Sequence, residues 1–271
     1  MKSHGLYWGI GLIALGVLLI LDTLGLLPFD LSGLILPLLL ILAGIWVIWG
    51  LARPRPAIAA TPLRVPLDGA DTLKLKVRHG AGRLRIDSSG DDPSLLTAEF
   101  GVSAHSDVER QGQSLAVRLR PADDWFFLSA PWSWQRGALP DWSIHLPTAC
   151  SVELDLQTGA SEAAVDLAGI RLAGLRFETG ASSTEIELPM PQGSVPVRLK
   201  GGAGAIRLTL SPKAEARVTP RADLGTITLE PNHFTRQGPD HLTANFAQSD
   251  NRYEIDVSVV AGSVDVSRRT S

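Results

Sequence analysis

A short motif recurs through this chain at nearly constant spacing, and it constrains the fold more than any other feature. Two alternating apolar residues lead to a Gly-Ala-Gly or Gly-Ala-Ser step, and two more alternating apolar residues follow. The first glycine of this step is Gly80, Gly159, Gly180 or Gly202 in the four copies. Gly159 and Gly180 lie 21 residues apart, and Gly180 and Gly202 lie 22 residues apart. This period, with two apolar runs in each unit, predicts two β-strands per repeat.

Repeats of this size predict an all-β domain over residues 65–271, a parallel β-solenoid with coils of about 20–22 residues. Stacked units would bury their alternating apolar residues in one continuous strip, and looser copies occur over 218–229 and 253–266. Small residues are needed where the chain turns and neighbouring coils approach, so the four glycines are expected at solenoid corners. Polar alternates should form solvated outward ladders: Asp155, Glu178, Glu185, Glu187, Arg198 and Arg207.

Residues 91–149 interrupt the repeat. Residues 91–113 are typical of a strand pair around polar turns, and an aromatic cluster follows. Its members are Trp125, Phe126, Phe127, Trp132, Trp134 and Trp142. One interpretation makes these rings a cap over the open end of the solenoid, whose strand edges need cover. The other makes them an interaction patch, because tryptophan is enriched at binding hot spots.

Residues 1–52 carry only three of the 53 charged side chains, namely Lys2, Asp22 and Asp30. Two apolar runs, over about 6–27 and 31–51, are each long enough to cross a bilayer as a helix. They predict a transmembrane helical hairpin embedded in the lipid bilayer. A cleaved signal peptide is the alternative, but no strongly basic start or small-residue cleavage site is present. Gly5 and Gly9 form a Gly-x-x-x-Gly step that favours close helix packing within the hairpin or in a homo-oligomer.

Residues 53–64 form a proline-rich linker, since alternating prolines cannot continue a helix. Lys2 precedes the first expected span and Arg53 and Arg55 follow the second, whereas the intervening turn is acidic. Positive flanks stay in the cytoplasm, so we expect a multi-pass protein of the inner (cytoplasmic) membrane. Both termini and the β-domain would then be cytoplasmic.

Charge and motif content exclude several function classes. Beyond residue 52 the chain has 24 Lys and Arg against 26 Asp and Glu, without a basic block, which argues against nucleic acid as a partner. The single Cys150 and the scattered histidines favour neither a metal site nor a catalytic Cys150–His145 pair. The segment 201–204 (GGAG) lacks the Lys-Ser/Thr of a phosphate loop. We therefore expect no enzyme activity, no cofactor and no metal.

Two regions of the chain resemble a known bacterial family. The hairpin segments 8–12 (WGIGL) and 36–46 (LPLLLILAGIW) resemble the LiaI/LiaF-like transmembrane region of envelope-stress proteins. The segments 154–160 (LDLQTGA) and 175–181 (LRFETGA) resemble the LiaF C-terminal, "toast-rack" or adhesin-like β-repeat domain. The resemblance implies a membrane-anchored β-solenoid, and LiaF is regarded as a negative regulator of a cell-wall-stress sensor kinase.

The leading hypothesis is therefore a membrane-anchored interaction or regulatory protein. It would bind another membrane or signalling protein, with LiaF-like modulation of a sensor system in the envelope stress response. An extracytoplasmic structural or adhesin-like module is the first alternative. An enzyme with an unrecognised site is the second, and a deep polar pocket with a perturbed titratable group would reveal it.

Overall fold

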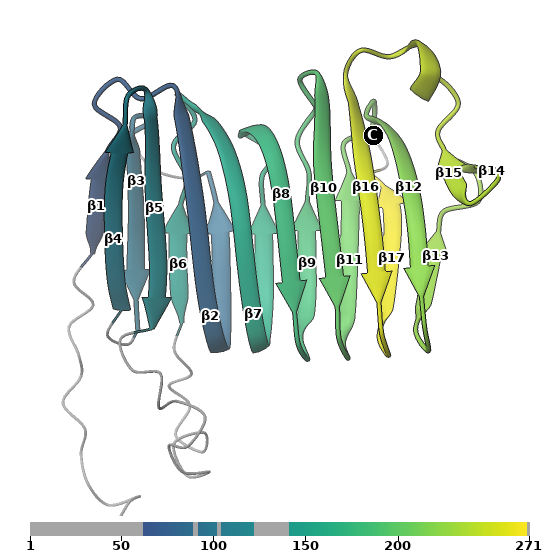
Figure 1. Ribbon diagram of the computed structural model, residues 1–271, viewed down its shortest axis with the longest axis horizontal. Helices are drawn as coiled ribbons and strands as arrows, with labels where there is room; N and C mark the ends of the chain where they lie inside the picture. The colour runs from purple at the N-terminus through teal and green to yellow at the C-terminus, as the bar shows by residue number, and fades with distance from the viewer. Residues whose placement is uncertain (1–61, 89–91, 102–103, 122–140, 270–271) are drawn as a thin grey trace, which may run out of the picture. The chain divides into compact units, whose positions relative to one another are not determined.

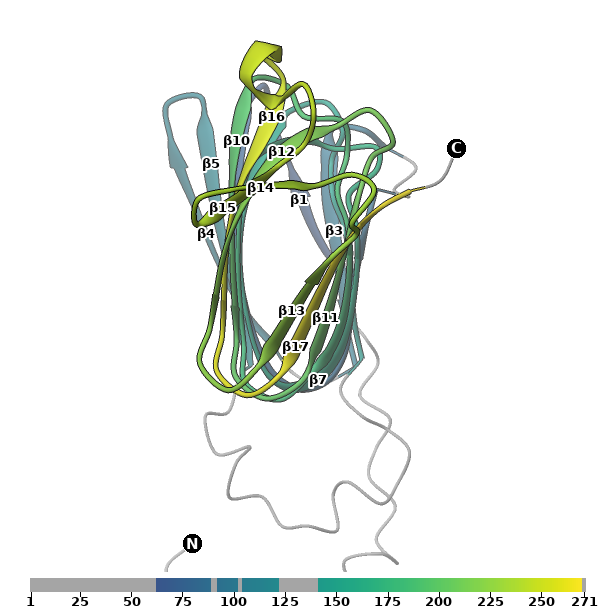
Figure 2. The ribbon, with the colours of Figure 1, turned by 90° about the vertical axis from the view of Figure 1, so that its right-hand side faces the viewer.

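The computed structural model describes residues 62–88, 92–101, 104–121 and 141–269. These residues form an all-β solenoid that is flattened into two facing walls of strands (Figures 1 and 2). The all-β repeat domain predicted from the glycine spacing is thus confirmed. The expected transmembrane hairpin lies outside the described residues. No helix within the described ranges has the length and apolarity to cross a membrane.

Seven parallel strands lie side by side in the first wall, which we call wall A. In spatial order they are β5 (Ser114–Pro121), the first half of β2 (Thr72–Asp87), the first half of β7 (Ser151–Asp166), β8 (Arg171–Thr179), β10 (Ser194–Gly201), β16 (Arg252–Val259) and β12 (Glu215–Ala222). Each strand pairs in parallel with its neighbours, as expected for a solenoid.

Seven more parallel strands form the opposite wall, wall B. Their order is β6 (Trp142–His145), the second half of β2, the second half of β7, β9 (Ser183–Glu187), β11 (Ala205–Leu210), β17 (Ser263–Arg268) and β13 (Thr226–Leu229). β2 and β7 run through both walls as continuous 16-residue strands. A rung of the solenoid therefore consists of one strand in each wall.

The core fills the space between the walls. Along each strand the burial alternates, so that Leu73, Leu75 and Val77 point inward while the intervening lysines point outward. In-register pairing places Leu154 beside Leu75 and Leu156 beside Val77 on the next rung. Repetition of this pairing builds one continuous apolar strip. A single rung would leave its part of this strip exposed to water, so it is not expected to be stable by itself.

The spatial order of the rungs departs from the order of the chain. The last rung in sequence, β16 with β17, lies between β10 with β11 and β12 with β13. The outermost rung, β12 with β13, thus comes earlier in the sequence than the rung that separates it from β10 and β11. Glycine and apolar periodicity cannot reveal this order, because every rung presents the same pattern to both neighbours.

The described residues within the interruption at 91–149 lie at one end of the solenoid, and they correct the expected pairing of two strands over 91–113 with each other. β3 (Leu95–Phe100) pairs antiparallel with β6 and with β1 (Leu63–Pro66) in wall B, whereas β4 (Ala104–Gln111) pairs antiparallel with β5 in wall A. β3 contributes buried apolar residues, but β4 is exposed along nearly its whole length, so the two strands belong to different walls. β1 begins at Leu63, two residues before the expected start of the β-domain at residue 65.

The opposite end is only partly covered. β15 (Asp240–Leu242) pairs antiparallel with β12 at Arg217 and Val218, and β14 (Thr235–Gln237) pairs with β15. A short 3-10 turn, η3 (Phe246–Gln248), places the centroid of the Phe246 ring 5.6 Å from the guanidinium carbon of Arg217 and 5.2 Å from that of Arg252. In wall B, β13 pairs with β17 on one side, and no described strand pairs with its other side.

Candidate functional site

The two walls differ in charge. The seven parallel strands of wall A carry twelve basic residues and six acidic residues, whereas those of wall B carry four basic and six acidic residues. The basic residues of wall A are Lys74, Lys76, Arg78, Arg118, Arg120, Arg171, Arg176, Arg198, Lys200, Arg217, Arg221 and Arg252. Its acidic residues are Glu153, Asp155, Glu178, Glu215, Glu254 and Asp256. The outer surface of wall A is therefore net positive and that of wall B is net negative.

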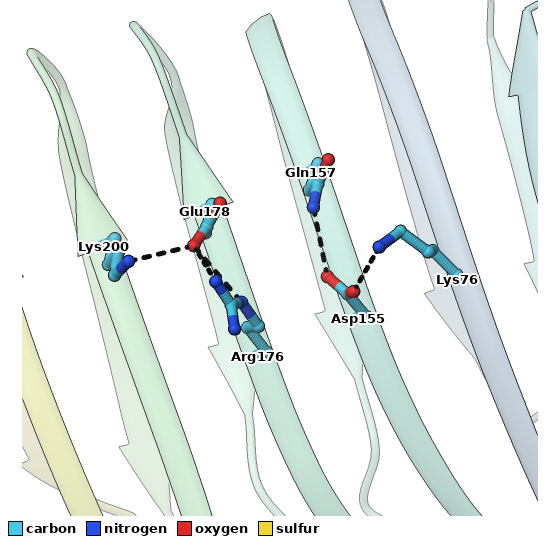
Figure 3. Close-up of polar contacts among 6 residues, drawn as sticks. All are labelled: Lys76, Asp155, Gln157, Arg176, Glu178 and Lys200. Carbon is cyan, nitrogen blue, oxygen red and sulfur yellow. Dashed lines mark hydrogen bonds and ion pairs between the residues drawn. The ribbon is translucent and has the colours of Figure 1, made fainter.

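Part of this charge is paired within β8 and across neighbouring rungs (Figure 3). Lys76 Nζ lies 2.9 Å from an Asp155 carboxylate oxygen, and Glu178 Oε1 lies 2.7 Å from Arg176 Nη2 and 3.2 Å from Lys200 Nζ. Hydrogen bonds from Arg176 and Lys200 hold the pKa of Glu178 below its ordinary value, and the bond to Glu178 raises the pKa of Arg176. Glu178 is thus a shared anion that orders two cations on wall A.

A shallow groove of about 270 Å³ opens on wall A across β8, β10, β16 and β12. Its charged lining is Arg176, Glu178, Arg198, Lys200, Arg221 and Asp256. Within the described ranges Arg198, Arg221 and Asp256 make no side-chain hydrogen bond or ion pair. The groove therefore keeps a positive excess after Glu178 has been neutralised.

Wall B has a second depression, of about 330 Å³, with the opposite sign. Four carboxylates line it, from Asp87, Asp166, Glu185 and Glu187, together with Arg85 and Arg207. Most of these groups are paired: Arg207 with Glu185, Arg269 with Glu187, and Arg85 with Asp87. Among the described residues, no cluster of three or more His, Cys, Asp or Glu has an arrangement that would hold a metal ion.

The two residues weighed as a nucleophile and base do not meet. His145 Nδ1 lies 2.6 Å from Asp87 Oδ1 on the outer side of wall B. Cys150 is fully buried, and this burial raises the pKa of its thiol, which disfavours the reactive thiolate. The histidine is therefore engaged by a carboxylate, and the thiol is held inert within the core.

The four motif glycines stack at the bend between the walls. A Cβ on Gly159 would lie 2.3 Å from the Gly80 carbonyl oxygen, and one on Gly202 would lie 2.5 Å from the Gly180 carbonyl oxygen. Gly180 has a looser contact, at 3.1 Å from the Gly159 oxygen. A parallel ladder joins Ser182, Gly204, Gly262 and Gly225. These glycines fix the register that aligns the outward side chains, and they carry no chemistry of their own.

Of the six aromatic residues in the predicted cluster, Trp142 is the one that the structure describes. Trp142 is fully buried, and its ring makes edge-on contacts with the rings of His79 and Phe100. The distances between ring centroids are 5.3 Å to His79 and 4.8 Å to Phe100. Trp142 belongs to the core beneath β3 and β6, and its burial argues against the interpretation that makes this ring part of an interaction patch. Trp125, Phe126, Phe127, Trp132 and Trp134, together with Gly5 and Gly9, lie outside the described residues.

The partly covered end of the solenoid is a second candidate site. Leu224, in the turn before β13, is 87% exposed. Ile227 and Leu229 on β13 are half-buried against the core, because no further rung of the described part of the chain covers them. An apolar patch thus adjoins the strand edge that lacks a described partner.

The sequence interpretation missed the groove, because it treated Arg198 and similar alternates only as solvated surface. A signal was nevertheless present in the spacing from the glycines. Arg176 and Arg198 each lie four residues before their motif glycine, and Glu178 and Lys200 each lie two residues before it. In the same way Lys200, Ser258 and Arg221 each lie four residues before Gly204, Gly262 and Gly225, and they are neighbours in register.

Comparisons with known proteins bear on the fold. The family model described as the N-terminal domain of toast_rack, DUF2154, matches residues 57–209. A comparison with proteins of curated function gives no match.

Solved structures extend the likeness over most of the domain. The crystal structure of a candidate cell adhesion protein from Clostridium sporogenes superposes with a TM-score of 0.68 at 18% identity, covering 78% of this chain and 100% of that one. A candidate adhesin from Bacteroides fragilis aligns at 8% identity with a TM-score of 0.19, covering 79% of this chain and 100% of that one. The first likeness shows the fold alone.

Proposed function

Because this chain belongs to the family defined by the N-terminal domain of toast_rack, we propose that it is a membrane-anchored interaction module rather than an enzyme. The described surface consists of regular side-chain ladders with shallow depressions, a form that suits contact with a large partner better than enclosure of a small substrate. The solved relative from Clostridium sporogenes is described as a candidate cell adhesion protein, which supports the same class.

The anchor in this proposal is the apolar hairpin over residues 1–52, joined to the solenoid by the proline-rich linker. The partner is another membrane or signalling protein. The resemblance to LiaF supports a regulatory role in the envelope stress response, with the solenoid on the cytoplasmic side. Reporter fusions at residue 60 and after Ser271 test this orientation, since alkaline phosphatase activity at either point would place the solenoid outside the cell.

The observation that carries the proposal is the edge of β13 that pairs with no described strand. Thr226 and Glu230 donate their backbone N–H groups toward β17, to Gly262 and Val266. Alternation along a strand therefore turns the N–H groups of Ile227 and Leu229 toward the open side. Free donors and acceptors on a strand edge are a template for an added strand. Leu224 beside this edge supplies an apolar contact that would favour a partner strand over water.

Photocrosslinking of the full-length chain in its native membranes tests this proposal. A photoreactive residue at Thr228, exposed on β13, is expected to give a discrete adduct with one partner protein. The matched control is Ser183, which is exposed in the middle of wall B, and it is expected to give no such adduct. Substitution of Leu224 by lysine should weaken the adduct from Thr228. Identical adducts from both positions, or none from Thr228, would refute an interaction at the open end.

A further inference from the structure

We propose that the groove on wall A binds the phosphate of an anionic phospholipid headgroup, so that wall A rests on the bilayer surface. This inference depends on the membrane anchoring proposed above, and it assigns a ligand to a surface other than the β13 edge.

The donors in the groove suit a phosphate. Arg198 from β10 and Arg221 from β12 each offer a planar guanidinium with several N–H donors, which match phosphate oxygens in pairs. Ser258 of the intervening strand β16 supplies a hydroxyl between Lys200 and Arg221, its neighbours in register. Lys200 Nζ lies 3.2 Å from Glu178 Oε1. This ion pair uses one of the three N–H donors of the lysine and leaves two for a second anion.

Their spacing also suits such a ligand. Arg198 and Arg221 lie on strands that are about 10 Å apart across the wall, and Arg221 lies two residues further along, level with Lys200 and Ser258. Long side chains from these positions can close on one phosphate group lying over β16. Asp256 is the one carboxylate in the groove without an ion pair among the described side chains, and two guanidinium groups outweigh it.

The charge asymmetry of the walls selects the orientation. An anionic bilayer attracts the net positive wall A and repels the net negative wall B. The groove is a depression in an open wall, so a headgroup that projects from a flat surface can enter it. The linker between residue 52 and β1 has about ten residues, which span at most on the order of 35 Å when extended. Anchoring by residues 1–52 would therefore keep the solenoid within reach of the surface.

The test uses the full-length chain in lipid nanodiscs, with a fluorophore on a single introduced cysteine. The native Cys150 is fully buried, so it is protected from labelling. Gln157→Cys places the fluorophore on wall A beside the groove, and Ser263→Cys places it on wall B. Discs contain phosphatidylcholine alone or with phosphatidylglycerol, and each also carries a headgroup spin label as quencher. We expect strong quenching at position 157 in phosphatidylglycerol discs only, and little quenching at position 263 in either disc.

Two double variants separate the groove from the general charge of the wall. Arg198→Gln with Arg221→Gln is expected to abolish the quenching at position 157. Lys74→Gln with Arg118→Gln removes the same charge from wall A outside the groove, and it is expected to leave most of the quenching. Added inorganic phosphate should reverse the quenching at an ionic strength where chloride does not, as competition for a phosphate site requires.

Equal loss of quenching in the two double variants would overturn the groove as the site, because diffuse charge would then explain the contact. Equal quenching in both disc types, or insensitivity to phosphate, would overturn it as well. A chain that fails to enter the discs would refute the anchoring, and the headgroup contact with it. A chain that enters them without quenching at position 157 would overturn the headgroup contact alone.

Discussion

Gly159 lies so close to Gly80 on the preceding rung that a Cβ atom on Gly159 would be 2.3 Å from the Gly80 carbonyl oxygen. The obstacle is backbone, which cannot move without breaking the register between β2 and β7. Gly159→Ala is therefore expected to lower the free energy of unfolding by about 3 kcal/mol, at the upper end of overpacking costs. Chemical denaturation followed by circular dichroism would measure this loss.

Gly174 supplies the matched control for that substitution. A Cβ on Gly174 would have its nearest neighbour at 3.6 Å, an ordinary van der Waals contact with Pro196. Gly174→Ala should change the free energy of unfolding by less than about 1 kcal/mol. Similar losses for the two alanine variants would contradict the idea that backbone approach at the bend sets the register.

Trp142 is expected to contribute to stability rather than to partner binding. Its ring is fully buried against His79 and Phe100, so Trp142→Ala should cost about 3–5 kcal/mol of the free energy of unfolding. Leu224→Ala, at an 87% exposed position, should leave stability within about 0.5 kcal/mol of the parent chain. Thermal unfolding of both variants distinguishes the roles, and a stable Trp142→Ala chain would place that ring outside the core.

Glu178 should make the stability of wall A depend on pH. Arg176 and Lys200 lower its pKa in the folded chain, so its ion pairs stabilise the fold above the ordinary pKa of 4.5. This stabilisation is lost as the pH falls through the lower, folded value. The pairs lie at the surface, so Glu178→Gln should cost only about 0.5–1 kcal/mol at pH 7. Denaturation series between pH 7 and pH 3 should show the two chains converging.

Glu153→Gln serves as the control for this pH series. The Glu153 carboxylate lies 3.8 Å from Lys74 Nζ, and both side chains are more than half exposed. Such a pair contributes little, so this variant should follow the parent chain at every pH. A pH-dependent difference as large as that of Glu178→Gln would show that neither value reports the network around Glu178.

The sequence predicted the repeat better than it predicted the arrangement of the repeats. Alternating residues such as Leu154 and Leu156 need only local pattern to be placed inward, and the spacing from Gly159 to Gly180 encodes the register between their rungs. The placement of β3 and β4 could not be predicted in this way, because the wall that each strand joins depends on pairing with β6 and β5, and local pattern does not encode these partners. The groove escaped notice because its lining depends on the insertion of β16, which places Asp256 and Ser258 between the strands that carry Arg198 and Arg221.

That insertion leads to a further prediction, which compares two isoleucines in different rungs. Ile255 on β16 lies between Val197 of β10 and Val218 of β12 and is almost fully buried. Ile227 on β13 lies in the outermost rung and is half-buried. Ile255→Ala should therefore cost about 3–4 kcal/mol of the free energy of unfolding, and Ile227→Ala about half as much or less. If the rungs followed chain order, β16 would be outermost and the ranking would reverse.

Removal of residues 251–271 should unfold β12 and β13 together. These strands pair with the rest of wall A and wall B only through β16 and β17 among the described strands. A truncated chain in which the Val218 amide is still protected from hydrogen exchange would contradict this prediction.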